Sequence, residues 1–180
     1  EIDQNKQVEN LSSVNGGIEI KNGSSAKNVE TVNGGIEMGK HVSVRKASTV
    51  NGGIEAGKHF TAEHNLTTVN GGISVDSQSS IGGSVETVNG GIDLKHTSIG
   101  QDIKTVNGDI YLKNSSTVEG NIVYEQSGKK SWWKDRDASL PTLTIDNSST
   151  VNGKIILKRK VILEIENETL LAKVERHYQD

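Results

Sequence analysis

The stretch Val50-Asn51-Gly52-Gly53-Ile54 decides the fold, because it is one of five identical pentapeptides in the first half of the chain. Copies begin at Val14, Val32, Val50, Val69 and Val88, and a variant, Val-Asn-Gly-Asp-Ile, begins at Val106. The asparagines of successive copies are 18, 18, 19, 19 and 18 residues apart. A fixed period of this size is typical of repeat proteins, in which one supersecondary unit stacks on copies of itself.

The apolar residues between two copies show strand alternation interrupted by corners. After Val32, they follow at Ile36, Met38, Val42 and Val44. Steps of two place side chains on one face of a strand, and steps of four mark places where the chain turns. Each repeat is therefore predicted to hold two or three short strands joined by tight bends, with one apolar face directed inward.

Two architectures are compatible with such strands. Asn-Gly between apolar residues is a strong hairpin signal, which favours an antiparallel meander. A meander needs a turn at both ends of each strand pair, however, and Asn-Gly occurs once per 18 or 19 residues. Identical residues at one period are what stacked parallel coils produce. We therefore predict an all-β fold, a single-stranded parallel β-helix (β-solenoid) of about seven or eight coils with capped ends.

The repeated asparagines are predicted to form a structural ladder at one corner. Asn tolerates the left-handed region and Gly accepts positive φ, so Asn-Gly-Gly suits a corner. Stacked amides can then hydrogen-bond along the column, as in cross-β ladders. The predicted ladder consists of Asn15, Asn33, Asn51, Asn70, Asn89 and Asn107.

The chain is predicted to form a single domain, residues 1–180, with one insertion. The segment Leu112–Val118 aligns with Ile145–Val151 at a step of 33 residues, which is one 18-residue coil plus 15. The extra residues fall at about 124–138. Residues 1–13 are predicted to form an N-terminal cap, 14–165 the coils, and 166–180 a C-terminal cap, because a terminal coil exposes unpaired backbone.

Composition excludes several classes of protein. A net charge of −3 with interspersed signs offers no basic stripe for nucleic acid. The chain has no Cys, so it cannot hold disulfides or thiolate metal sites. No apolar run is long enough for a transmembrane helix. The chain begins at Glu1 without Met, which fits either a truncated form or a mature protein from which a signal peptide was removed.

Two columns of polar residues have the residue types of metal sites. His41 and His59 occupy equivalent positions and should be neighbours, but no carboxylate accompanies them. An acidic column could bind calcium, although each acid follows an inward Ile and so fits a solvated outer face. Its members are Glu19, Glu37, Glu55 and Asp93, with Ser74 interrupting and Asp109 one position earlier. We predict no metal site and no cofactor.

The insertion is the one asymmetric feature and the predicted place of ligand binding. It carries both tryptophans, Trp132 and Trp133, beside Lys134 and Arg136. Flat apolar faces surrounded by donors suit a glycan, and loops on one face of a repeat protein are often its binding surface. The alternative is a loop whose tryptophans cover the flank of a coil. No catalytic residues are predicted, since repeated acids indicate a scaffold.

The repeated Val-Asn-Gly-Gly/Asp-Ile, preceded by Thr31, Thr49, Thr68, Thr87 and Thr105, resembles a bacterial β-solenoid family of adhesin-like proteins of unknown function. The resemblance covers about residues 14–165, and bactofilin-like solenoids share a related pattern. It implies a non-enzymatic protein exported to the periplasm, cell surface or extracellular space.

We therefore expect a monomeric adhesin or structural binding module whose partner is a glycan or an envelope or matrix component. A self-assembling, polymer-forming scaffold is the alternative. A polysaccharide-processing β-helix enzyme is a more distant one.

Overall fold

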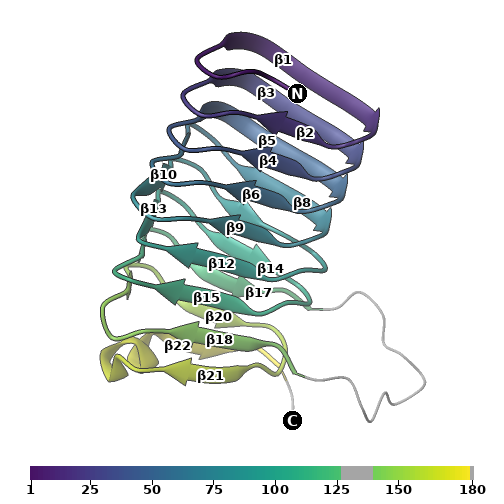
Figure 1. Cartoon of the computed structure of the whole chain (residues 1–180). Coiled ribbons are helices and arrows are strands. Elements are labelled where there is room, and N and C mark those ends of the chain that lie inside the picture. The colour runs from purple at the N-terminus through teal and green to yellow at the C-terminus, as the bar shows by residue number, and fades with distance from the viewer. Residues whose placement is uncertain (127–139, 179–180) are drawn as a thin grey trace, which may run out of the picture.

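The computed structural model describes residues 1–126 and 140–178, and these residues wind into the predicted parallel β-solenoid (Figure 1). Each coil contributes one strand to an eight-stranded sheet, called sheet A here. The strands of sheet A are β2 (Ile18–Ile20), β4 (Ile36–Met38), β6 (Ile54–Ala56), β9 (Ile73–Val75), β12 (Ile92–Lys95), β15 (Ile110–Lys113), β18 (Thr142–Ile145) and β21 (Ile162–Ile165).

The rest of each coil builds a fourteen-stranded sheet, called sheet B. Its first three strands are β1 (Gln7–Asn15), β3 (Ser25–Asn33) and β5 (Ser43–Asn51). The others are β7 (Thr61–Ala62), β8 (Leu66–Asn70), β10 (Ser79–Ile81), β11 (Val85–Glu86), β13 (Thr97–Ile99), β14 (Ile103–Thr105), β16 (Thr117–Val118), β17 (Ile122–Tyr124), β19 (Thr150–Val151), β20 (Ile155–Leu157) and β22 (Val174–Arg176).

All strand pairs are parallel and lie one coil apart, so the antiparallel meander is excluded. Ile36 pairs with Ile54, and Ile54 pairs with Ile73. Across the insertion, Leu112 pairs with Ile145 and Val118 with Val151, which confirms the step of 33 residues. The coil that follows the insertion therefore rejoins the stack in the expected register.

Sheet B changes shape after β5 because the next coil is one residue longer. Val44 pairs with Ala62 at a step of 18, whereas Ala47 pairs with Leu66 at a step of 19. The additional residue breaks the nine-residue strand into β7 and β8, both of which pair with β5. From there on, each coil turns a third corner where the first three coils run straight.

The core is a set of apolar columns, and it also contains the threonine of each Thr-Val-Asn-Gly motif. Thr31, Thr49, Thr68 and Thr87 are all buried. Each hydroxyl donates a hydrogen bond of 2.8–2.9 Å to the carbonyl of the first motif glycine one coil earlier. The burial of these hydroxyls is thus compensated, as a buried polar group requires.

The six asparagines lie in one column with continuous side-chain hydrogen bonds. Each Nδ2 donates to the Oδ1 of the asparagine one coil earlier, at 2.9–3.0 Å, from Asn107 back to Asn15. The backbone, however, is not left-handed there. The non-glycine residues with positive φ lie at another corner and include His41 (57°), His59 (59°) and Gln78 (63°).

The motif glycines are required by close approach rather than by positive φ. A Cβ atom on Gly52 would lie 2.1 Å from the carbonyl oxygen of Gly34, and one on Gly71 would lie 2.1 Å from that of Gly52. The second glycine has more room, since a Cβ on Gly35 would lie 3.4 Å from the Gly53 oxygen. The expectation of left-handed backbone at Asn-Gly-Gly was wrong for this reason: only Gly16 among these glycines has φ in the positive range.

The two ends of the stack differ. Residues 1–13 are not a separate cap, because β1 pairs in register with β3 and Ile2 forms a bridge with Ile20. They form the first coil. At the other end, a 3₁₀ helix, η1 (Glu168–Lys173), buries Leu170 against the core before β22 pairs with β20. Within the described ranges, no helix is long and apolar enough to cross a membrane.

Gly52→Ala is expected to destabilise the protein by about 3 kcal/mol, because the added methyl group must push two coils apart. The matched change Gly35→Ala, at the more open second position, should cost less than about 1 kcal/mol. Urea unfolding of both variants measures the difference. Equal midpoints for the two variants would show that the stacking distance does not require the first glycine.

Asn51→Leu is expected to cost about 1–2 kcal/mol, because it removes one hydrogen bond to Asn33 and one from Asn70. Asn147→Leu is the control, since Asn147 is exposed and its side chain makes no hydrogen bond within the described part of the chain. Thermal melting compares the two variants. A control that loses as much stability as Asn51→Leu would argue against the ladder as a stabilising element.

Candidate functional site

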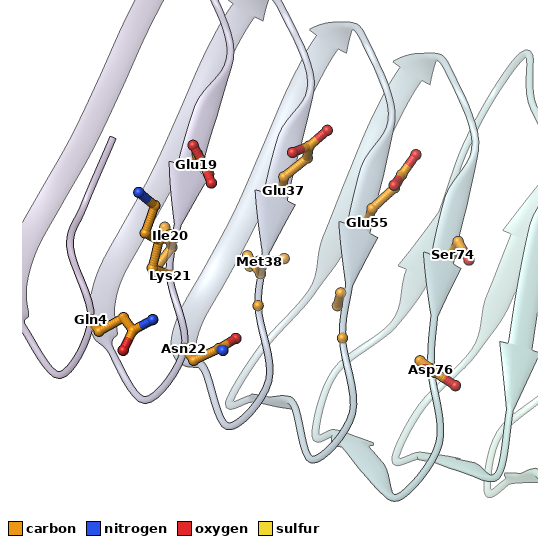
Figure 2. A pocket seen from close by; sticks show the side chains of 13 residues that line it. Gln4, Glu19, Ile20, Lys21, Asn22, Glu37, Met38, Glu55, Ser74 and Asp76 are labelled. Carbon is orange, nitrogen blue, oxygen red and sulfur yellow. The ribbon is translucent and has the colours of Figure 1, made fainter.

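The acidic column lies on the outer face of sheet A, where the register places Glu19, Glu37 and Glu55 beside one another. Ser74 and Asp93 continue the column. The three glutamates and Ser74 line a shallow groove of about 510 Å³ that Lys21 and Asn22 border at one end (Figure 2). No group of three or more His, Cys, Asp or Glu in the described residues could hold a metal ion. The column is a solvated face of the scaffold.

The histidine pair lies at the corner where the backbone is left-handed. The rings of His41 and His59 stack with centroids 4.4 Å apart and an interplanar angle of 7°. The parallel rings contact each other through their faces, whereas two ligands of one metal ion would point ring nitrogens at a common centre. His41 and His59 are neighbours, as predicted, and their rings form a stacked column.

The regular repeat pattern changes at the described residues on either side of the insertion, which are called its foot. Trp132, Trp133, Lys134 and Arg136 lie outside the described residues, and the residues that flank them form the described part of the site. The Thr142 backbone is held from both sides: its N–H donates to Asp109 Oδ1 at 2.7 Å, and its carbonyl accepts from the Tyr124 hydroxyl at 3.0 Å. Asp109 and Tyr124 thereby fix the point where the chain re-enters sheet A.

Arg159 closes the acceptor end of the asparagine ladder beside this foot. Its guanidinium donates to the carbonyl of Val106 at 2.7 Å and to Oδ1 of Asn107. Tyr124 pairs with both Thr105 and Leu157, so Arg159 lies two coils beyond Asn107 and reaches back across one coil. It thus fills the position at which the ladder has no further asparagine.

These groups surround a shallow pocket of about 350 Å³. Asn107, Asp109, Tyr111, Pro141 and Arg159 are among its lining residues. The pocket combines a carboxylate, a guanidinium, an amide and an aromatic ring, which are the groups that recognise polar ligands such as sugars. Much of this hydrogen-bonding capacity is already engaged within the protein.

Electrostatics at the foot favour protonated tyrosines. The negative charge of Asp109 is the main cause that raises the pKa of Tyr111, whose hydroxyl lies 3.4 Å from Asp109 Oδ2. Lys113 Nζ lies 4.7 Å from the centroid of the Tyr111 ring, in a cation–π contact. Burial raises the pKa of the Tyr124 hydroxyl. Both phenols therefore act as neutral hydrogen-bond donors at neutral pH.

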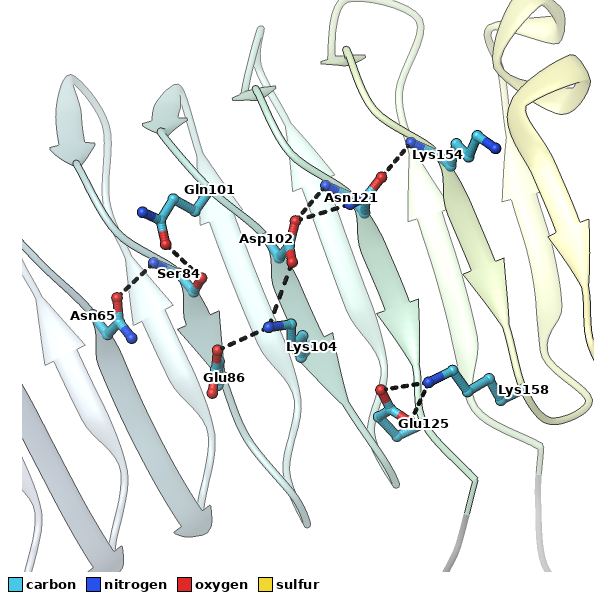
Figure 3. A network of polar contacts seen from close by, with 10 residues as sticks. All are labelled: Asn65, Ser84, Glu86, Gln101, Asp102, Lys104, Asn121, Glu125, Lys154 and Lys158. Carbon is cyan, nitrogen blue, oxygen red and sulfur yellow. Dashed lines mark hydrogen bonds and ion pairs between the residues drawn. The ribbon is translucent and has the colours of Figure 1, made fainter.

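A polar network runs over sheet B and links successive coils (Figure 3). Lys104 Nζ lies 3.4 Å from both Glu86 and Asp102. Asp102 Oδ1 accepts from the backbone N–H of Asn121 at 2.8 Å, and Asn121 Oδ1 accepts from that of Lys154 at 2.9 Å. The network occupies corner positions of consecutive coils, so its role is to fasten the stack.

Sequence reasoning placed the site at the insertion but did not identify Asp109, Tyr124 and Arg159 as its anchors. The signal for Asp109 was present, since it replaces the second glycine in the sixth motif copy. Arg159 carries no such signal, because its contact with Asn107 depends on the coil between them. Tyr124 stands out only as one of three tyrosines in the chain.

Asp109→Asn is expected to lower the pKa of Tyr111, because it removes the charge that disfavours tyrosinate. Ultraviolet absorbance of tyrosinate during an alkaline titration measures the shift, and Tyr111→Phe identifies the step that belongs to Tyr111. Circular dichroism confines the comparison to pH values at which both proteins are folded. An unchanged titration in Asp109→Asn would contradict the contact between the two side chains.

The comparisons with known proteins assign no family. No protein-family model matches the chain, and neither a curated protein nor a solved structure matches it significantly.

Proposed function

We propose that this protein is a non-enzymatic, exported module of the cell envelope that serves as an adhesin or structural binding module. The observation that supports it most directly is the break in the repeat at residues 109–142. The coils before it repeat the same outward columns, whereas here an insertion leaves the stack between two anchored strands. Recognition needs a surface that differs from the scaffold, and loops held by a rigid repeat array provide it.

The proposed ligand is a glycan, bound by the insertion through Trp132 and Trp133 with Lys134 and Arg136 around them. Aromatic faces bind the apolar faces of sugar rings, and basic groups favour an acidic glycan or an envelope polymer. The anchored foot supports the proposal, because a binding loop is more selective when its ends are fixed. Export is supported by the absence of cysteine and by the resemblance to adhesin-like solenoids.

A polymer-forming scaffold is the second candidate, favoured by the first coil. Because residues 1–13 form a coil rather than a cap, β1 leaves one edge of sheet B open. An open edge can pair with another chain. The structure of the opposite end limits this candidate, since η1 covers the last coil.

The double variant Trp132→Ala/Trp133→Ala is expected to lose binding to immobilised glycans or envelope material while its melting temperature stays nearly unchanged. Val32→Ala is the control, because Val32 is an exposed apolar residue on a coil distant from the insertion. If the tryptophans instead cover a flank of the stack, the double variant should lose about 2–4 kcal/mol of stability. Unchanged binding together with that loss would overturn the glycan proposal.

Localisation is tested separately, in the cells that produce the protein. A membrane-impermeant labelling reagent should modify the lysines of the exported protein in intact cells, at a level close to that of a known envelope protein. Labelling only after lysis would overturn export and leave the binding experiment interpretable.

A further inference from the structure

The first coil presents an unprotected strand edge. β1 pairs only with β3, so its other edge has no partner within the described residues (Figure 1). It is nine residues long, contains no proline or lysine, and carries Glu9 as its single charge. Natural edge strands are usually shortened, charged or covered, because an open edge pairs with other chains. β1 has none of the usual forms of protection except that one carboxylate.

The last coil is protected in each of these ways. Lys173 Nζ donates to the free carbonyls of Val151 at 2.5 Å and Asn152 at 3.2 Å, at the edge of β19. The final strand of sheet B, β22, has only three residues, two of which are Glu175 and Arg176. Sheet B is therefore protected at β19 and β22 and open at β1.

The asparagine ladder has the same polarity. At its acceptor end, Arg159 binds Oδ1 of Asn107. At its donor end, Asn15 Oδ1 accepts from Asn33, while Asn15 Nδ2 has no acceptor in the part of the chain that the structure describes. The exposed fraction of Val14 is 65%, against 40% for Val32 one coil further on, because no coil covers it. The open end thus offers an unused donor and uncovered apolar surface.

We infer that β1 pairs antiparallel with β1 of a second copy, about a twofold axis through Ser12, to give a head-to-head dimer. In an antiparallel pair, residues directly opposite lie on the same face of the sheet. An axis at Ser12 places the inward-facing Leu11 opposite the partner's Ser13, which also faces inward. It places Asn10 opposite the partner's Val14, both on the outer face. An axis at Leu11 would instead place Ser13, which faces inward, opposite Glu9, which faces outward. Opposite residues would then lie on different faces of the sheet, which an antiparallel pair does not allow.

Hydrogen-bond complementarity selects a second copy as the occupant of this edge. The Ser12 axis puts Asn15 opposite the partner's Glu9, so that the unused amide donor of one ladder meets the single carboxylate of the other edge. Glu9 Oε2 is held by Lys27 Nζ at 2.5 Å, which leaves Oε1 as the acceptor. Each β1 edge carries both the donor, Asn15, and the acceptor, Glu9. Two antiparallel copies therefore form the hydrogen bond between Asn15 and Glu9 twice. Because the other edges of sheet B are protected, pairing through sheet B stops at two chains.

Sedimentation equilibrium over a range from about 1 to about 100 µM tests the dimer, since mass action makes a dimer dissociate on dilution. The wild-type chain should approach twice its own mass at the upper end of the range. Ser12→Lys places two like charges opposite each other at the axis and should raise the dissociation constant at least tenfold. Ser48→Lys is the matched control, because it lies in the same column, which holds a lysine naturally at Lys104.

A cysteine at the axis tests the register. The chain has no cysteine, so Ser12→Cys can only be oxidised to a disulfide with its own copy. Directly opposite Cβ atoms in an antiparallel pair come close enough for that bond. We expect mild oxidation to link Ser12→Cys and to leave Ser48→Cys unlinked. A wild-type chain of single mass throughout, Ser12→Lys that dimerises like wild type, or masses that grow beyond two chains would each overturn the proposal.

Discussion

From the second to the sixth copy of the motif, each coil rests on the previous one at the first motif glycine, where there is no room for a Cβ atom. The position is filled by backbone alone: a methyl group on Gly90 would lie 2.0 Å from the Gly71 oxygen. This contact fixes the distance between coils and brings neighbouring motif residues into register. The buried Thr87 hydroxyl reaches the Gly71 carbonyl only because the coils are this close. The asparagine amides span the same gap on the outside.

The stacking contact also gives the protein a direction. The ladder amides from Asn33 to Asn107 all donate toward the N-terminal end. The hydroxyls of Thr31, Thr49, Thr68 and Thr87 donate in the same direction. A directional column must end in unused acceptors on one side and unused donors on the other. Arg159 supplies donors at the acceptor end, and Lys173 does the same for the carbonyls of β19. Lysine and arginine cannot serve at the donor end, which needs an acceptor such as a carboxylate.

The sequence predicted most of this fold because each coil repeats the same local requirement. The parallel register, the inward columns and the step of 33 across the insertion follow from spacing alone. The backbone conformation at the corners does not follow from spacing. Close approach and positive φ both select glycine, and a sequence does not separate these two causes. Gln78 occupies the left-handed corner although glutamine is not a residue that signals it. The Arg159 contact depends on a reach across one coil, which periodicity does not encode.

The difference between the two motif glycines explains where the scaffold could acquire a site. From the second to the sixth copy of the motif, the first glycine position has no room for a side chain, whereas a Cβ on Gly91 at the second position would lie 3.4 Å from the next backbone oxygen. Asp109 occupies that second position in the last pentapeptide, and its carboxylate binds the chain as it returns from the insertion. A departure from the repeat was tolerated at the motif glycine that has room for a side chain. The residue placed there anchors the segment that we propose binds the ligand.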